Sequence, residues 1–476
     1  MKTVRSITMA LAALLTGAAE AQTQTQTQPQ TQTQSPTQTQ TQTQADTPAA
    51  RIVVDVAQFR TQFLDKDRAY SPAARKEAES RLADLEKNAA TLAPVRFDLA
   101  IAQITALADN GHTLASSAQR SRRYERADVR LVPFGEDFNV LRVKAENEDL
   151  LGARLVAIDG VPIDKLRELG RSLSGGVPAW RDRNVPYFLE SPAQLRALGV
   201  GRGDAPPAYS FITRDGRTLN RTFTVSPVGG DRVGGNATRW MFPVLAPLED
   251  RAWRTLLPEA RAPWALQEPV RRFRWRHDEA LGAVIVEMRQ SSNAQTERLA
   301  DFFADVEKAV AAHAPRHLVL DLRLNGGGDL TTTRDFAEKL PTLVGGKIYA
   351  LISPWTFSAA ISTLGYLKQA APDRVVIVGE PVGDRLQFFA EGRPITLTHS
   401  KEMVLPATER HDYQTGCRQM DDCHRNVVNR PIAVKTLDPD IAAPWTLDDY
   451  VAARDPAMDA VAKDIGKSRP AAPAGS

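Results

Sequence analysis

Residues 317–328 read HLVLDLRLNGGG, an apolar run that ends in a polar residue and three glycines. A short apolar run that is closed by glycine predicts a strand buried on both faces. AVIVEM, KIYALIS and RVVIVGE are three further apolar runs nearby, and amphipathic helical stretches separate them. Strands that alternate with helices in this way predict a parallel sheet with right-handed crossovers, and therefore an α/β fold.

Ligands bind such a sheet at the carboxyl ends of its strands. Three loops are expected at that edge, at residues 325–328, 354–358 and 381–384. A glycine cluster leaves backbone N–H groups free to face an oxyanion, and Ala359 N–H is a second candidate donor. Ser358 begins the next helix, where the helix dipole favours a developing alkoxide. The residues alone leave two roles open for Ser358, a nucleophile or a helix N-cap.

The N-terminus has the features of an export signal. Residues 1–21 contain Lys2 and Arg5, then an apolar stretch, then Ala-Glu-Ala, and this order predicts a secretory signal cleaved after Ala21. The apolar stretch is shorter than the roughly 20 residues that span a bilayer, so a membrane anchor is the weaker interpretation. Residues 22–50 are rich in Gln and Thr and predict a disordered linker. We expect a secreted or periplasmic protein without stable membrane insertion.

The remaining chain divides by pattern into four parts. Residues 51–125 predict a helical domain, in which Ser71-Pro72 begins a helix. Residues 126–228 contain strands, a helix and a hairpin, and predict either a PDZ-like module or an ordinary β-rich insert. Residues 229–462 form the α/β core, and residues 463–476 are expected to be a disordered tail.

Cysteine content and charge exclude several classes of function. Cys417 and Cys423 are expected to form a disulfide in an oxidising compartment, and zinc binding with His411 and His424 is the weaker alternative. The 60 Lys and Arg against 57 Asp and Glu give a net charge of +3 without a basic block, so nucleic acid is not expected as a partner. No nucleotide-binding glycine motif and no G-x-S-x-G elbow occurs, and we expect neither a cofactor nor a metal.

Several motifs resemble the C-terminal processing (tail-specific) peptidases, which are serine peptidases with a crotonase- or ClpP-like α/β core. HLVLDLRLNGGG, TFSAA and VVIVGEPVGD resemble the family's core, LDPDIAAPWTLDDYVAARDPAMDAV resembles its closing segment, and GARLVAIDGVPID and ADNGHT resemble upstream stretches. The resemblance implies that Ser358 is the nucleophile of an acyl-enzyme mechanism. It also implies Gly327 and Ala359 as oxyanion-hole donors, and a peptide or protein as the substrate.

The general base departs from the family's Ser–Lys pattern. Arg385 stands near the expected lysine, and arginine stays protonated. Lys368 lies about 15 Å from Ser358 along the same predicted helix, which makes it a poor substitute. The tricorn-like branch uses a histidine, in a place that resembles His112 here, and histidine suits a general base at neutral pH.

Other assignments remain open. The rival bases are His399, His411 and His424, and the third catalytic residue is one of Asp384, Glu391 and Asp412. A catalytically degenerate protein that binds peptides or apolar ligands is the alternative function, because the related interphotoreceptor retinoid-binding modules use this fold for binding. The sequence does not indicate an oligomeric state.

Overall fold

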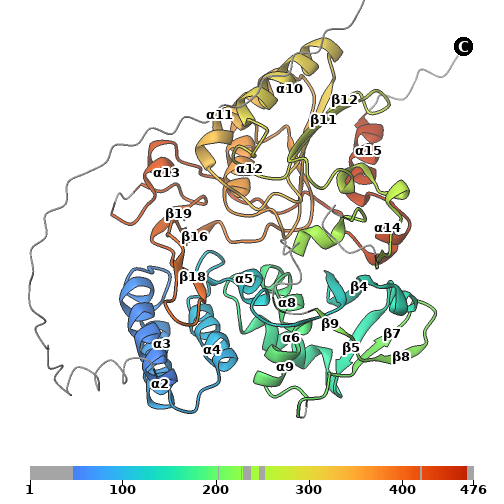
Figure 1. The fold of residues 1–476 in the computed structure, drawn as a ribbon. Coiled ribbons are helices and arrows are strands. Elements are labelled where there is room, and N and C mark those ends of the chain that lie inside the picture. Colours follow the sequence, from blue (N-terminus) through green and yellow to red (C-terminus); the bar gives the residue numbers. More distant parts are fainter. Residues whose placement is uncertain are drawn as a thin grey trace, which may run out of the picture. The chain divides into compact units, whose positions relative to one another are not determined.

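A six-stranded sheet forms the α/β core, with the strand order β11-β12-β13-β14-β15-β20 (Figure 1). The strands are β11 (Phe273–Asp278), β12 (Ala283–Met288), β13 (His317–Asp321), β14 (Ile348–Ile352), β15 (Val375–Gly379) and β20 (Ile441–Ala442). All neighbours are parallel except β11, which is antiparallel to β12. The prediction that HLVLDLRL and KIYALIS form neighbouring parallel strands is confirmed, since Leu318 lies opposite Ile348 and Asp321 opposite Leu351.

Helices cover both faces of this sheet, because successive side chains of each strand point to opposite faces. Val284 and Leu318 belong to the face packed against α10 (Leu299–His313), α11 (Leu330–Leu343) and α12 (Ala359–Ala370). Ile285 and Val319, one residue further along, belong to the opposite face, which packs against α15 (Pro456–Ser468). Burial on both faces explains why these strands are apolar throughout.

The structure is a computed structural model that describes residues 47–201, 203–226, 228, 237–245, 252–418 and 421–468. Residues from Thr47 onward belong to one compact unit. The predicted signal peptide lies outside the described residues, as does the predicted domain boundary at residue 229.

Two of the predicted domain boundaries need correction. Helix α2 begins at Pro48, inside the predicted linker, because Thr47 caps the helix and Pro48 suits its first turn. At the other end of the chain, α15 continues to Ser468, inside the predicted tail.

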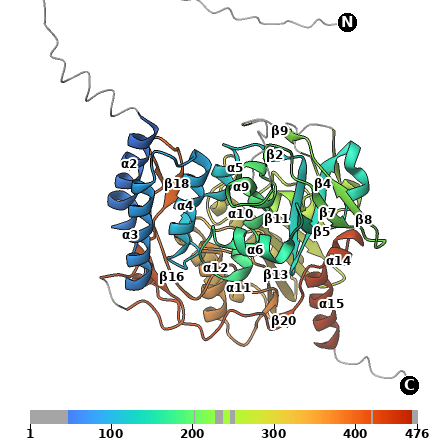
Figure 2. The ribbon, with the colours of Figure 1, turned by 90° about the horizontal axis from the view of Figure 1, so that it is seen from below.

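The N-terminal helices are α2 (Pro48–Gln58), η1 (Phe59–Leu64), α3 (Pro72–Lys87), α4 (Pro94–Ala106) and α5 (Ser117–Ser121). Ser71 caps α3 through the N–H of Ala74, which confirms the helix start predicted there. Figures 1 and 2 both show α2–α4 beside β16 (Gln387–Ala390) and β18 (Met403–Leu405), and β18 pairs with β1 (Leu114–Ala115). The predicted helical region therefore packs against a segment nearly 300 residues further along the chain.

A second, antiparallel sheet lies in the predicted β-rich region. Its strands are β10 (Trp253–Thr255), β4 (Asp137–Lys144), β5 (Arg154–Ile158), β7 (Tyr209–Ile212), β8 (Thr218–Arg221), β3 (Val129–Phe134) and β6 (Val161–Pro162). Strands β7 and β8 form the predicted hairpin, with Ile212 opposite Thr218. Four helices accompany the sheet: α6 (Ile163–Arg171), α7 (Pro178–Asp182), α8 (Val185–Leu189) and α9 (Pro192–Ala197). Side chains of α6, α8 and α9 share one buried cluster with α2–α4, so the helical and β-rich regions have a common core.

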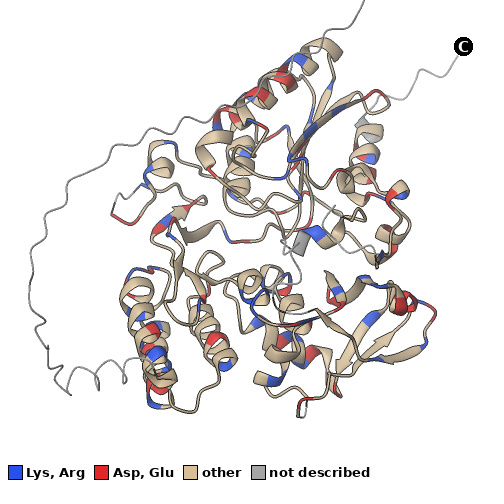
Figure 3. Ribbon diagram, viewed as in Figure 1, with Lys and Arg blue, Asp and Glu red and all other residues tan. Residues whose placement is uncertain are grey.

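The other elements are shorter: β2 (Arg126–Ala127), η2 (Ala145–Leu150), β9 (Val225–Ser226), η3 (Ala237–Met241), η4 (Glu259–Arg261), η5 (Trp264–Leu266), β17 (Ile395–Thr396), β19 (Glu409–Asp412), α13 (Arg425–Asn429) and α14 (Leu447–Val451). Acidic and basic side chains are interspersed over the elements (Figure 3). Among the described residues, no helix combines the length and apolar character needed to cross a membrane.

Candidate active site

Ser358 is at the carboxyl edge of the six-stranded sheet, in the turn between β14 and α12. The turn is fixed by its own side chains, since Thr356 Oγ1 donates to Leu322 O at 2.8 Å and Ser353 N–H donates to Thr356 Oγ1 at 3.0 Å. Ser358 has φ +54°, a region that residues other than glycine rarely occupy. It precedes α12, yet its side chain makes no capping hydrogen bond. The N-cap role is therefore not the one that its hydroxyl performs in this structure.

Gly327 lies directly beside Ser358. It has φ +104°, and a Cβ at this position would be 2.6 Å from Ser358 Cβ, so both conformation and space require glycine. Its N–H, however, donates to Asn325 Oδ1 at 3.0 Å. The sequence did not indicate this hydrogen bond. Because of it, one of the two N–H groups expected to bind the oxyanion already has an acceptor.

Ala359 N–H is the other expected donor. Ala359 is the first residue of α12, so its N–H has no acceptor within the helix. Within the described part of the chain it donates no hydrogen bond elsewhere. An unpartnered N–H next to Ser358, at the positive end of a helix dipole, is suited to an anionic oxygen.

His112 is held by a carboxylate. Its Nδ1 lies 3.1 Å from Asp384 Oδ2, and both side chains are buried. In a neutral imidazole, a carboxylate acceptor at Nδ1 favours the tautomer that has its proton on Nδ1 and a lone pair on Nε2. Nε2 is buried and has no hydrogen-bond partner among the described residues. Asp384 therefore orients the ring of His112 through Nδ1, and Nε2 is left to accept a proton.

Aromatic rings place His112 next to the serine turn. Its ring stacks on Phe357, the residue before Ser358, with centroids 4.3 Å apart, and on Phe388 at 4.8 Å. No hydrogen bond joins Ser358 Oγ to His112 in the part of the chain that the structure describes. The direct Ser358–His112 contact remains a prediction.

The loop that carries His112 is anchored on both sides. Asn110 exchanges two hydrogen bonds with the backbone of Phe389, at 2.9 and 3.1 Å. Thr113 Oγ1 donates to buried Asp67 at 2.7 Å, and the same carboxylate accepts from Ala407 N–H. No sequence motif indicates a role for Asp67, and nothing in the ADNGHT stretch distinguishes Asn110 as the anchor of the loop.

Of the three candidates for the third catalytic residue, only Asp384 contacts His112. Glu391 contacts His411 instead, at 3.1 Å, and Asp412 accepts from Thr415 and Gln387. The rejected bases also have other partners: Lys368 Nζ donates to Val375 O at 2.7 Å, and Arg385 forms an ion pair with Asp109.

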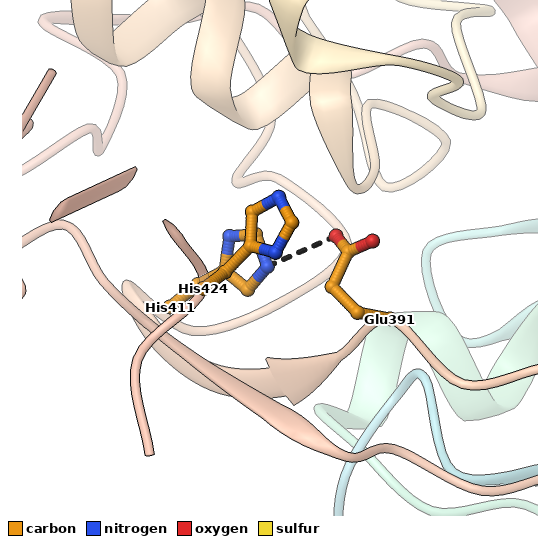
Figure 4. A group of neighbouring side chains, drawn as sticks. All are labelled: Glu391, His411 and His424. Carbon is orange, nitrogen blue, oxygen red and sulfur yellow. Dashed lines mark hydrogen bonds and ion pairs between the residues drawn. The ribbon is translucent and has the colours of Figure 1, made fainter. Parts of the chain in front are cut away.

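The rival histidines lie elsewhere or face other groups. His399 lies in a turn whose backbone N–H donates to Asp55. His411 and His424 gather with Glu391, and their ligand atoms lie within 4.8 Å of one another (Figure 4). The two imidazole rings stack almost parallel, with planes 16° apart. Since an imidazole lone pair lies in the plane of its ring, stacked rings do not aim at one ion, and we propose no metal site there.

Cys417 and Cys423 are joined in a disulfide, with Cα atoms 5.9 Å apart. Their sulfurs are therefore not metal ligands in this structure, in agreement with the favoured interpretation. His424 follows the second cysteine directly, and its Nδ1 lies 2.6 Å from Glu409 Oε2. The disulfide thus closes the loop that leads into the histidine pair.

No protein family and no curated protein matches this sequence. Solved structures do match. Mature CPAF in complex with lactacystin aligns with 88% of this chain and 98% of its own, at 14% identity and a TM-score of 0.53. A CPAF point mutant aligns with 88% of this chain and 96% of its own, at 12% identity and a TM-score of 0.54. The chain has the fold of CPAF.

The CPAF fold confirms the predicted relationship to the C-terminal processing peptidases at the level of the fold. The photosystem II D1 C-terminal processing protease aligns with 84% of this chain and 96% of its own, but its TM-score of 0.33 is too low to support an argument.

Proposed function

We propose that this chain is a serine peptidase in which Ser358 attacks a peptide carbonyl and His112 is the general base. Asp384 would be the third residue, orienting the histidine. The proposal rests chiefly on one observation: a non-capping serine at a helix start follows a phenylalanine whose ring stacks on a histidine that a buried carboxylate orients. The fold agrees with this, since serine peptidases are built on it, CPAF among them.

The mechanism follows from the atoms available. Nε2 of His112 takes the proton of Ser358 Oγ as Oγ bonds to the carbonyl carbon, and Asp384 stabilises the imidazolium that forms. The oxyanion accepts a hydrogen bond from Ala359 N–H, and from Gly327 N–H once that group leaves or shares Asn325 Oδ1. The C–N bond then breaks, and the amine leaves with the proton from His112. Water, activated by the same histidine, hydrolyses the acyl-enzyme on Ser358.

Three further proposals accompany the first. The six-stranded sheet and its helices would form a crotonase-like core, and the second sheet with α6 would form a PDZ-like module. The protein would be exported, with the signal removed after Ala21, into an oxidising compartment where a Cys417–Cys423 disulfide is stable. N-terminal sequencing of the mature protein from periplasm or culture medium tests the export, and an intact Met1 contradicts it.

Labelling with a fluorophosphonate probe, which phosphorylates activated serines, tests the proposed function. We expect the purified full chain to be labelled and to hydrolyse casein peptides, and Ser358→Ala to lose both activities while keeping its circular dichroism spectrum. Ser362→Ala is the matched control, because Ser362 is one turn further along α12 and its hydroxyl shares a hydrogen bond with the hydroxyl of Tyr413.

Two results would refute the assignment: labelling or hydrolysis that persists in Ser358→Ala, or a folded wild type that neither reacts nor hydrolyses. The second result would favour the alternative in which the chain binds peptides or apolar ligands without cleaving them. Loss of the nucleophile is expected to lower the rate roughly 10⁴-fold or more.

A further inference from the structure

Arg183 is a buried cation without an anionic partner. It follows α7, is 9% exposed, and its Nη1 is buried without a hydrogen-bond partner among the described residues. Within the residues that the structure describes, the guanidinium of Arg183 makes no ion pair with any carboxylate. Other buried arginines do: Arg120 pairs with Glu402 at 2.9 Å, and Arg274 with Glu287 at 2.6 Å.

The position of Arg183 connects it to the candidate active site. Its guanidinium carbon lies 3.7 Å from the ring centroid of Trp180. The opposite neighbour of Trp180 is Phe357, whose ring is 3.6 Å away and which precedes Ser358. The ring of Trp180 therefore separates the cation from Phe357, the residue before the proposed nucleophile.

Two cavities meet at this arginine. One, of about 260 Å³, is lined by Gly111 and Thr113, which flank His112, and by Trp180 and Arg183. The other, of about 270 Å³, is lined by Arg183 and by Pro354 and Trp355 from the turn that leads to Ser358. The linings contain chain neighbours of His112 and Ser358 rather than these two residues themselves. A peptide that extends from the candidate site along the chain segments around it would enter this space.

A buried guanidinium without a counter-ion is unfavourable, because burial removes water without supplying acceptors. Burial accordingly lowers the pKa of Arg183 to about 9, and no carboxylate counteracts that effect. Arginine remains protonated at neutral pH, and its planar fork of donors matches a carboxylate in two parallel hydrogen bonds. A peptide brings such a carboxylate in an acidic side chain or at its C-terminus.

We infer that Arg183 binds a carboxylate of the substrate peptide, so that the proposed peptidase selects an acidic residue or a free C-terminus near the cleaved bond. This inference rests on the proposed function for its substrate class. The cation–π contact with Trp180 holds the guanidinium in place before the peptide arrives. Arg183 is thus a specificity-determining residue rather than a catalytic one.

Direct binding to the full-length Ser358→Ala variant tests the inference, because it requires no cleavage. Three otherwise identical decapeptides serve as probes: one with an internal Glu and an amidated C-terminus, one with Gln and a free C-terminus, and one with Gln and an amidated C-terminus. We expect the first or the second to bind at least tenfold more tightly than the third in calorimetry, and the better of the two identifies the source of the carboxylate.

Variants then assign the preference to Arg183. Adding Arg183→Met, which removes the charge at similar length, should abolish the preference, and Arg183→Lys should retain part of it. Arg181→Gln is the matched control on the same short helix, since Arg181 already pairs with Asp109. Equal or undetectable binding of all three peptides, or a preference that survives Arg183→Met, overturns the inference. Failure of the proposed function gives a different result: Ser358 of the wild type is not labelled by the fluorophosphonate, while the chain still binds the carboxylate-bearing peptides more tightly.

Discussion

At the scale of single residues, the candidate site depends on a few unusual environments. Ser358 has a positive φ, which costs free energy in a residue with a side chain, and the hydrogen-bonded turn around Thr356 maintains it. Gly327 leaves room for Ser358 because it has no Cβ. His112 has its Nδ1 engaged by Asp384 while Nε2 is left unpartnered among the described residues. None of these environments would be needed by a serine that only caps a helix.

Asp384→Asn tests the orientation of His112. Asparagine is isosteric but offers an N–H as well as an oxygen, so the tautomer with the proton on Nδ1 is no longer enforced and Nε2 is no longer assured as the acceptor. We expect kcat for a peptide substrate to fall roughly 10³- to 10⁴-fold, with little change in thermal stability.

Glu391→Gln is the matched control for that variant, because it alters the equivalent carboxylate of the His411 pair. Its kcat is expected to stay within about tenfold of the wild type. The reverse order of effects, with Glu391→Gln the more damaging change, would move the general base from His112 to His411.

At the scale of elements, the sequence predicted the core better than the periphery. The strands β12 to β15 are apolar on both faces and the helices between them are amphipathic, so hydrophobic periodicity alone located them. The short helices α7–α9 were not predicted, because segments of five or six residues are too short to show a period. Arg183, at the end of α7, was missed with them.

The site was predictable only in part for a similar reason. Ser358 and His112 lie in stretches that resemble a known family, but the choice of Asp384 over Glu391 or Asp412 depends on a contact between residues 272 positions apart. No local pattern encodes such a contact. It arises because Asn110 docks the His112 loop onto β16, through hydrogen bonds to Phe389 that imitate a strand pairing.

Asn110→Ala tests this docking. The change removes three hydrogen bonds of a buried side chain, two to the backbone of Phe389 and one to Thr113 Oγ1, worth about 1 kcal/mol each, and frees the loop that carries His112. We expect kcat to fall at least tenfold, while thermal unfolding shifts by only a few degrees.

Asn88→Ala, at the exposed end of α3 where Asn88 Nδ2 bonds only to Asp84 O, should leave kcat unchanged. An Asn110→Ala variant with full kcat would show that the loop keeps His112 in place without this pairing.

At the scale of the whole molecule, segments distant in sequence converge on the carboxyl edge of the six-stranded sheet. The loop after α4 brings His112 to Asp384, which follows β15, and the C-terminal segment brings Asp455 to Arg323, which follows β13. Arg323, which follows β13, donates to Asp455 at 2.7 and 2.9 Å and to Asp321 at 2.6 Å. Its carbonyl also accepts from Ser353, in the turn that leads to Ser358. One buried arginine thus connects the last helix, the glycine loop and the serine turn.

Asp455→Ala should therefore destabilise the fold in a pH-dependent way. Burial alone would raise the pKa of Asp455, but the charge and hydrogen bonds of Arg323 outweigh burial and lower the pKa below its ordinary 3.8. A carboxyl group whose pKa is lowered on folding stabilises the protein above its unfolded pKa, and this contribution is lost as the pH falls through the folded value. We expect Asp455→Ala to lower the free energy of unfolding by about 3 kcal/mol at neutral pH.

Urea denaturation of the wild type and the variant, at neutral pH and at a pH well below 3.8, measures the difference. The control is Asp459→Ala, four residues further on in the first turn of α15 and exposed, which should change the free energy of unfolding by less than about 1 kcal/mol. The difference in the free energy of unfolding between wild type and Asp455→Ala should be smaller in acid, because the protonated carboxyl group no longer attracts Arg323. An equal difference at both pH values would mean that Asp455 stabilises the fold by packing rather than by its charge, and that its interaction with Arg323 is not electrostatic.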